Sequence, residues 1–409
     1  MIHVCYGLYD KDGRYSKFTG ISICSIFENT TADVTIHILH DNTLSEENRD
    51  KFVWLVGRYG RQIKFYNVEK LCAEKIAEFK KLFPSIETAR FTIGTMYRLV
   101  IIDLFDTEME KVIYLDSDIL VNLDISELWN TNLRNKPLAA VAESQADSVG
   151  FPLVSKQHYL INSNLVTYEN YFNAAVMVLN LDYLREQKEK INSAMRFIAE
   201  NTECFCFDQD IMNYCFTNEY LHLDPKFDQF VARTLERVDK KISQRKVIYH
   251  YTGSDPTFDF SDSLNKLYFK YFVKTPWFDL KMLENISDGV KQIYNDGKSF
   301  ALRISKIVSG KRKIFFTTPA NEEAVRQIFS VTADEEIILS DKADMQIVLR
   351  EKLNDGDKIL FVIVANYQSV KKFLIQLGFT EYKDFINGTE FLTTEQGGIF
   401  NSYSLVKIM

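Results

Sequence analysis

The N-terminal part of the chain alternates between short apolar runs and longer segments whose apolar residues recur at helical spacing. The runs IHVCYGL, TIHILHDN and QIKFYNV have the length and composition of buried strands. Between them lie YSKFTGISICSIFENT and SEENRDKFVWLVGRYG, and the second begins with a serine and acidic residues that favour a helix N-terminus. Strands that alternate with helices predict an α/β fold with a mostly parallel sheet. Ligands bind beyond the carboxyl ends of such strands, so polar residues directly after apolar runs are the first functional candidates.

The pattern changes near residue 280. A polar, helix-compatible stretch follows, and beyond it the runs KIFFTTP, EEIILSD and KILFVIV alternate with helical segments, which predicts three further strands. A chain of 409 residues also exceeds the usual size of a single hydrophobic core. We therefore expect a large α/β domain over 1–280, a helical linker over 281–310 and a small α/β accessory domain over 311–409.

The charge and hydropathy patterns exclude two classes of partner. The formal net charge of -7 gives no attraction to phosphate backbones, so we expect no nucleic acid partner. No apolar run approaches the length of about 18 residues that a membrane-spanning helix needs, so we expect no integral membrane association. The N-terminal segment MIHVCYGLYD lacks a basic stretch followed by an apolar one, and we expect a cytoplasmic protein.

The segment KVIYLDSDILV carries the most specific chemical signal. An apolar strand runs into Asp116 and Asp118, and in extended chain residues two apart point to the same side. Two carboxylates so placed repel each other unless a cation compensates them, which favours a hard divalent ion that also bridges to a diphosphate. An isolated Asp-x-Asp is nevertheless more often a turn or helix-capping pair. The neighbouring motifs decide between these interpretations.

Further motifs accompany this pair in a fixed order along residues 1–280. They are TMYRLVIIDLF before it, and YFNAAVMVLNLDYLR, FDQDIMN, IYHYTGSDP and YFKYFVKTPWF after it. Together with the N-terminal strand and its polar turn, they resemble the family 8 retaining glycosyltransferases, the GT-A group that includes bacterial lipopolysaccharide galactosyltransferases and glycogenin. The resemblance implies a GT-A nucleotide-sugar-binding domain that transfers a hexose from a UDP-sugar donor to an acceptor hydroxyl.

The resemblance also implies a metal site. It makes Asp116 and Asp118 the metal-binding pair and His250, of the motif HYTG, the third protein ligand. Two carboxylates, one imidazole and diphosphate oxygens suit Mn2+, because imidazole favours a metal somewhat softer than Mg2+. Taken alone, a histidine after the apolar VIY is more often a hydrogen-bonded core residue than a ligand.

Five residues in three of these motifs correspond to family residues that hold the donor. Arg98 matches the family arginine that faces the diphosphate and sugar, although alone it would be assigned to a surface salt bridge. Asn173 and Ala174 match the reader of sugar hydroxyls and its small neighbour; the simple alternative is an asparagine that caps a strand. Asp208 matches the carboxylate that grips sugar hydroxyls, and Gln209 the amide near the open face of the anomeric carbon. Asp208 could equally be a helix N-cap.

Two stretches depart from the family pattern. Tyr9 and Asp10 fall where the family binds uracil and ribose, but the surrounding YGLYDKDGRYS differs from the usual motif. After His250 the chain reads SDPTF, with no lysine to contact the diphosphate, so either Ser254 with backbone amides or the metal with Arg98 provides that affinity. The residues expected to contact the donor are Tyr9, Asp10, Arg98, Asp116, Ser117, Asn173, Ala174, Asp208, Gln209 and Gly253.

Front-face displacement is the mechanism that the resemblance favours, because the family places an amide rather than a carboxylate nucleophile at the open face of the sugar. We expect galactose rather than glucose as the donor sugar. A family 8 domain with an extra C-terminal unit also resembles bacterial enzymes that glycosylate serine-rich adhesins, so the expected acceptor is a glycan or glycoprotein. A homo-oligomer formed through the C-terminal domain is a further candidate assembly. The competing function is a non-catalytic nucleotide-sugar-binding subunit that supports a partner glycosyltransferase.

Overall fold

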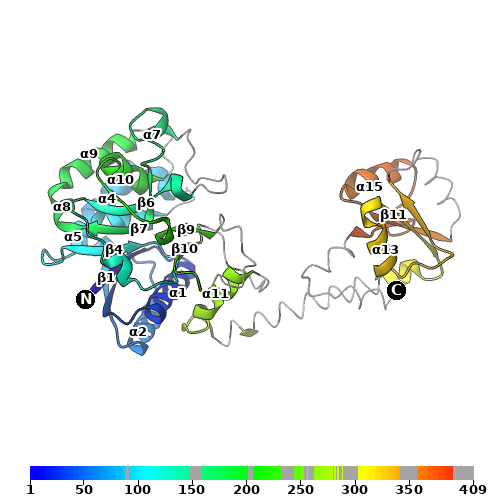
Figure 1. The fold of residues 1–409 in the computed structure, drawn as a ribbon, viewed down its shortest axis with the longest axis horizontal. Helices are drawn as coiled ribbons and strands as arrows, with labels where there is room; N and C mark the ends of the chain where they lie inside the picture. Colours follow the sequence, from blue (N-terminus) through cyan, green and yellow to red (C-terminus); the bar gives the residue numbers. More distant parts are fainter. Residues whose placement is uncertain are drawn as a thin grey trace. The chain divides into compact units, whose positions relative to one another are not determined.

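The computed structural model describes residues 1–87, 92–146, 158–200, 206–231, 244–252, 256, 262–279, 281, 283–284, 288, 303–340 and 357–389. The chain divides into two compact units, Met1–Asp279 and Leu280–Met409 (Figure 1), and each is described by itself. Within the described ranges, no helix is both long and apolar enough to cross a bilayer.

A seven-stranded sheet forms the centre of the first unit. Six of its strands run in one direction, and β7 runs antiparallel to both of its neighbours. The predicted α/β fold with a mostly parallel sheet is therefore confirmed. In spatial order the strands are β3 (Gln62–Asn67), β2 (Val34–His40), β1 (Ile2–Leu8), β4 (Lys111–Leu115), β7 (Phe172–Asn180), β6 (Leu138–Ala142) and β8 (Leu221–His222).

Strand burial follows from position in this sheet. All seven residues of β2 are buried, which suits a continuous apolar run in the sheet interior, whereas every residue of the edge strand β3 is exposed or half-buried. The helices lie on both sides of the sheet (Figure 1). Of these, α2 begins after Ser45, whose side chain accepts a hydrogen bond from the Asn48 N–H at 3.2 Å as an N-cap.

The helices of the first unit include several of a single turn. The α-helices are α1 (Arg14–Asn29), α2 (Glu46–Arg58), α3 (Val68–Leu71), α4 (Ala73–Leu82), α5 (Ile101–Leu104), α6 (Ser126–Trp129), α7 (Tyr159–Asn162), α8 (Leu181–Glu186), α9 (Lys188–Ala199), α10 (Phe207–Phe216) and α11 (Ser263–Phe272). The 3-10 helices are η1 (Pro84–Glu87), η2 (Ile93–Val100), η3 (Glu143–Ala146) and η4 (Pro225–Phe227).

A small second sheet brings distant parts of the chain together. It consists of β5 (Ile119–Val121), β10 (Ile248–His250) and β9 (Gln229–Phe230), with β10 in the middle. Because β10 pairs antiparallel with β5, His250 lies opposite Ile119, next to the end of the Asp-x-Asp segment.

The second unit is built on a four-stranded parallel sheet. The sequence predicted three strands, and the structure has a fourth, β14. This strand was not predicted because it is only three residues long and follows the polar stretch EYKD, so it has no apolar run of strand length. The strands in spatial order are β12 (Glu336–Leu339), β11 (Arg312–Thr317), β13 (Lys358–Ile363) and β14 (Phe385–Asn387). Its described helices include η7 (Pro319–Asn321), α13 (Glu322–Ile328) and α15 (Tyr367–Gln376), and residues 303–308 are also helical.

The expected linker over 281–310 lies largely outside the described residues. Its last described part, 303–310, contributes Ile304 and Val308 to a core cluster with Phe315, Phe329 and Phe361 of the second unit. The expected helical segment ADMQIVLREKL also lies outside the described residues.

Candidate active site

One cavity, of about 240 Å³, opens at the carboxyl ends of β1 and β4. Its lining brings together segments that follow separate strands, as expected for an α/β sheet. Because β7 runs antiparallel to β4, the start of β7 lies beside the end of β4, and the Asp116 N–H donates to the Ala175 carbonyl at 2.9 Å. The predicted residues that line the cavity are Tyr9, Arg98, Asp116, Ser117, Asp118, Asn173, Asp208, Gln209 and His250.

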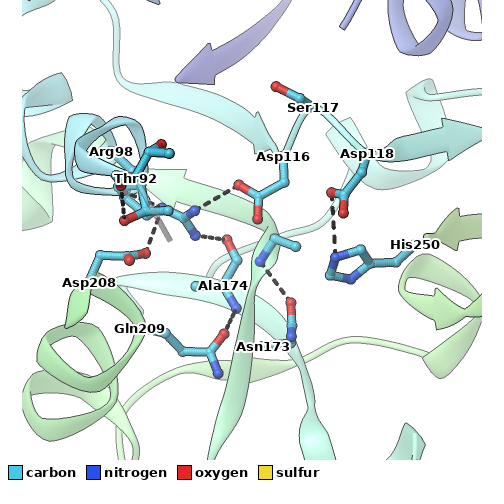
Figure 2. Close-up of polar contacts among 12 residues, drawn as sticks. Thr92, Arg98, Asp116, Ser117, Asp118, Asn173, Ala174, Asp208, Gln209 and His250 are labelled. Carbon is cyan, nitrogen blue, oxygen red and sulfur yellow. Dashed lines mark hydrogen bonds and ion pairs between the residues drawn. The ribbon is translucent and has the colours of Figure 1, made fainter. Parts of the chain in front are cut away.

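The three predicted metal ligands meet at one side of the cavity (Figure 2). Asp116 and Asp118 lie on the turn between β4 and β5, and His250 ends β10. One ligand atom from each lies within 4.8 Å of the others, and the His250 Nε2 is 3.6 Å from an Asp118 oxygen. The Tyr251 N–H donates to the Asp118 carbonyl at 3.0 Å, which ties the two segments together through the backbone.

The chemistry of this donor set suits a divalent cation. Burial raises the pKa of Asp116 above its usual range; Arg98 opposes that shift, and the like charge of Asp118 adds to it. Two carboxylates held near each other at the edge of a buried site are stabilised by a cation between them. Oxygen ligands with one imidazole nitrogen fit Mn2+ or a similar metal.

Arg98 lies in the floor of the cavity and is almost completely buried. From η2, its Nη2 contacts Asp116 at 2.7 Å and its Nε contacts Asp208 at 2.9 Å. Its Nη1 donates to the Ala174 carbonyl, and the guanidinium lies 4.4 Å from the centre of the Tyr114 ring. Burial alone would lower the pKa of Arg98, but the two carboxylates outweigh it and raise the pKa further. The alternative of a surface salt bridge is therefore wrong.

Asp208 is held by this arginine rather than by a helix terminus. It lies in the first turn of α10, and the N-cap position is Cys206, which makes no side-chain capping bond. Burial raises the pKa of Asp208 to about 6, although Arg98 lowers it and Asp116 adds to the rise. The N-cap interpretation of Asp208 does not hold in this structure.

Gln209 has a defined orientation. Its Oε1 accepts the Ala174 N–H at 2.9 Å, and its Nε2 donates to the Tyr171 hydroxyl oxygen at 3.4 Å. The Tyr171 hydroxyl in turn donates to Asp210 at 2.6 Å. A backbone N–H can only donate, so the amide oxygen of Gln209 must face Ala174.

Asn173 and Ala174 lie at the start of β7. The Asn173 amide donates to Glu143 at 2.7 Å and accepts the Ala175 N–H at 2.8 Å. Both ends of this buried side chain are therefore oriented by the protein. Ala174 contributes its backbone, whose N–H and carbonyl hold Gln209 and Arg98.

The other predicted donor contacts differ in placement. Tyr9 lines the cavity and is half-buried. Ser117 also lines it, and its hydroxyl accepts from Thr19 of α1 at 2.9 Å. Asp10 is buried away from the lining, where its oxygens accept from the Ser16 N–H at 3.0 Å and from Asn48 at 3.0 Å. Gly253 and Ser254 lie outside the described residues.

Two charged residues at or next to the site, Arg14 and Asp228, were missed at the sequence level. Arg14, the first residue of α1, lines the cavity with its guanidinium 5.4 Å from the Phe18 ring centre. A cation at a helix N-terminus opposes the helix dipole, and that conflict was an available signal. Asp228 contacts the His250 Nδ1 at 3.0 Å. No signal in the segment DPKFDQF indicates this contact, because it depends on the pairing of β9 with β10.

A comparison with protein families matches residues 8–255 to the model of Glycosyl transferase family 8. The chain belongs to glycosyl transferase family 8. The match covers every described residue of the cavity lining except Gly7, Pro256 and Tyr268. The chain is accordingly a glycosyltransferase, and the family resemblance predicted from its motifs is confirmed.

Two relatives with assigned names are similar over 61% and 65% of this chain. The chain is 28% identical over 258 residues to the lipopolysaccharide 1,3-galactosyltransferase of Salmonella typhimurium, covering 61% of this chain and 71% of that protein. It is 26% identical over 279 residues to a lipopolysaccharide 1,2-glucosyltransferase of Escherichia coli, covering 65% and 77%.

Two solved structures of glycosyltransferases share the fold. The galactosyltransferase LgtC, in complex with donor and acceptor sugar analogs, aligns with a TM-score of 0.50 at 20% identity, covering 67% of this chain and 96% of that one. The bifunctional glycosyltransferase WbbM aligns with a TM-score of 0.52 at 21% identity, covering 68% of this chain and 50% of that one. These similarities support the GT-A fold of the first unit.

Proposed function

We propose that this chain transfers a hexose from a UDP-sugar to an acceptor hydroxyl, with a divalent metal and with retention at the anomeric carbon. The observation that carries the proposal is the convergence of Asp116, Asp118 and His250 in one cavity with Arg98, Asp208 and Gln209. In the proposal, three potential metal ligands lie beside polar side chains that bind the sugar. This combination fits a site for a nucleotide-sugar donor better than a site that binds a metal ion alone.

Asp116, Asp118 and His250 are the residues that would hold the metal. When bound, Mn2+ would neutralise charge on the leaving diphosphate. Asp116 accepts from Arg98 with one oxygen, so a bound cation would meet a carboxylate that is already oriented. No general acid is required when the leaving group is a diphosphate whose charge is stabilised in this way.

Two arginines line the described part of the cavity, and they have different roles in the proposal. The Arg98 guanidinium contacts two carboxylates and a backbone carbonyl, and through these contacts it holds the site in shape. Arg14 is the first residue of α1 and also lines the cavity. It is the cation that we assign to the diphosphate in place of the lysine that is absent from SDPTF.

Retention is assigned to front-face displacement. A double displacement would need a carboxylate nucleophile, and Asp208 is tied to the Arg98 Nε at 2.9 Å. Gln209, whose oxygen accepts the Ala174 N–H, is the residue that we assign to the open face of the sugar, because its amide can contact the sugar without acting as a nucleophile. The acceptor hydroxyl then passes its proton to a phosphate oxygen of the departing UDP.

The donor sugar is proposed to be galactose, with glucose as the alternative. The names of the two relatives, one a galactosyltransferase and one a glucosyltransferase, support a hexose. The acceptor is proposed to be a glycan or glycoprotein, such as a serine-rich adhesin. A cytoplasmic site of action and a homo-oligomer formed through the second unit stay predictions.

The test is UDP release from a panel of UDP-sugars, with and without Mn2+, by the whole chain. We expect one UDP-hexose to be turned over only with the metal, and Asp118→Ala to abolish turnover while the unfolding temperature stays near that of the wild type. Asp124→Asn is the matched control. Asp118 directly precedes β5 and Asp124 lies shortly after it, but Asp124 does not line the cavity. Full turnover after exhaustive chelation would contradict metal dependence, and metal-dependent binding without any turnover would favour the non-catalytic subunit.

A further inference from the structure

His250 has a second carboxylate partner on the side away from the cavity. Its Nδ1 lies 3.0 Å from an oxygen of Asp228, while its Nε2 faces Asp118 at 3.6 Å. Both side chains of the closer pair are buried, with 7% of His250 and 1% of Asp228 exposed. The imidazole therefore lies between an inner carboxylate and a carboxylate of the proposed metal site.

The local structure leaves this imidazole little freedom. Asp228 directly precedes β9, which pairs in parallel with β10 and places Phe230 beside His250. The Phe230 and His250 rings meet edge to face, with their centres 5.0 Å apart. The Asp228 N–H donates to the Pro225 carbonyl at 3.2 Å, so the residue that contacts the imidazole is itself anchored by η4.

The buried Asp228 carboxylate by itself lowers the stability of the folded state. Its second oxygen, Oδ2, is buried and has no hydrogen-bond partner in the described part of the chain. Burying a carboxylate with one oxygen unsatisfied destabilises the folded state, and an apolar side chain of similar volume would avoid that cost. The carboxylate is thus better explained by what it does to His250 than by stability.

The chemical effect of such a contact is to select one imidazole tautomer. A carboxylate at Nδ1 accepts the N–H there and leaves the lone pair of the neutral ring on Nε2. In this chain Nε2 is the nitrogen that faces Asp118, and hence the position between the two aspartates of the Asp-x-Asp pair. A carboxylate behind a ligand histidine also makes it a better donor to a metal.

We propose that Asp228 is a positioning residue of the metal site, which holds the His250 ring with its Nε2 directed at the cation. This inference rests on the proposed metal-dependent function. It adds the residue that precedes β9 to a site otherwise built from the β4–β5 turn and β10. Asp228 contacts neither the donor nor the metal in this arrangement and acts through His250.

The experiment is a titration of the whole chain with Mn2+, with free Mn2+ followed by electron paramagnetic resonance and no sugar nucleotide present. Asp228→Leu removes the acceptor and is expected to weaken Mn2+ binding by about 10–100 fold. Asp228→Asn keeps an oxygen that accepts the Nδ1–H, so it is expected to regain most of that loss. Asp124→Asn, which removes a carboxylate that accepts from Thr30 and from the Ser126 N–H, should bind Mn2+ like the wild type.

The outcomes separate this inference from the proposed function. A wild-type chain that binds no Mn2+ contradicts the metal site itself. Wild-type affinity in a folded Asp228→Leu variant overturns the role of Asp228 and leaves the proposed function intact. Equal losses in the leucine and asparagine variants also overturn it, since the asparagine still accepts the hydrogen bond. If the leucine variant does not fold, unchanged Mn2+ affinity in both Asp228→Asn and Asp228→Ser, the latter too short to reach the ring, overturns it as well.

Discussion

Arg98 determines much of the geometry at the scale of single residues. A guanidinium presents several donors in one plane, so it can contact Asp116, Asp208 and the Ala174 carbonyl together. A lysine could not satisfy these partners at once, because its charge is a single compact group. Because the Arg98 guanidinium makes these three contacts, we assign the donor diphosphate to Arg14, the other arginine that lines the described part of the cavity.

Arg14→Ala is expected to weaken binding of UDP and of the UDP-sugar by about ten fold or more, because a charge-assisted contact contributes about 1.5–3 kcal/mol. Isothermal titration with UDP in the presence of Mn2+ measures this loss. Lys17→Ala is the control: Lys17 lies on the same helix, 5.2 Å from the same Phe18 ring, and does not line the cavity. Equal affinities for the Arg14 variant and the wild type would leave the diphosphate to other groups.

Gln209 is expected to affect rate rather than nucleotide affinity. In the proposal it meets only the sugar, while Asp116, Asp118, His250 and Arg14 hold the diphosphate. Gln209→Ala should bind UDP about as tightly as the wild type and transfer about 10–100 fold more slowly, the loss expected for a polar group that contributes about 1.4–2.7 kcal/mol in the transition state. Steady-state kinetics beside UDP titration tests this. Parallel losses of affinity and rate would show that the residue acts elsewhere.

At the scale of elements, β2 contains a buried histidine whose charge state matters for stability. His37 lies between His3 and the Tyr66 hydroxyl, at 3.0 Å and 3.1 Å, and is fully buried. Burial lowers the pKa of His37 from 6.5 to about 3, with the charges of His3 and Lys64 adding to the shift. The folded chain therefore keeps this histidine neutral where the unfolded chain protonates it.

A folded-state pKa below the unfolded one gives stability that is fully present above pH 6.5 and is lost as the pH falls toward 3. Each pH unit in that window should cost about 1.4 kcal/mol of unfolding free energy from His37. His37→Gln, which keeps polar groups and does not titrate, should have a shallower dependence between pH 7 and 5 in urea unfolding. The same slope in both proteins would assign the acid sensitivity to other groups.

The sequence predicted elements better than contacts. The strands β1, β2 and β3 and the helices between them follow directly from apolar periodicity, and Asp116 and Asp118 follow from the strand β4 that precedes them. The antiparallel insertion of β7, which brings Asn173 into the same cavity as Asp116, depends on long-range pairing that no local pattern records. Asp10 shows the converse: its motif position suggested a ligand, but its carboxylate organises the start of α1.

At the scale of the whole molecule, the second unit contains none of the residues that line the described cavity. The core of that unit includes Ile304 and Val308, so a cut near residue 308 would carry part of it along. The boundary at Asp279 is the better place to separate the units.

A chain ending at Asp279 is expected to keep metal-dependent UDP-sugar hydrolysis within a few fold of the whole chain and to lose transfer to a macromolecular acceptor. The reason is that the described donor-site residues all belong to Met1–Asp279. UDP release and acceptor glycosylation, measured side by side, test both parts. A folded truncated protein without hydrolysis would show that the second unit takes part in donor chemistry.

The pairing of β10 with β5 also orders events during synthesis. The aspartates emerge from the ribosome well before His250, which must fold back antiparallel onto a strand made some 130 residues earlier. A nascent chain that ends before β10 has the acidic pair without its imidazole, and also lacks the strand that covers β5. In the proposed metal site, the complete set of three ligands therefore exists only after almost the whole first unit has been translated.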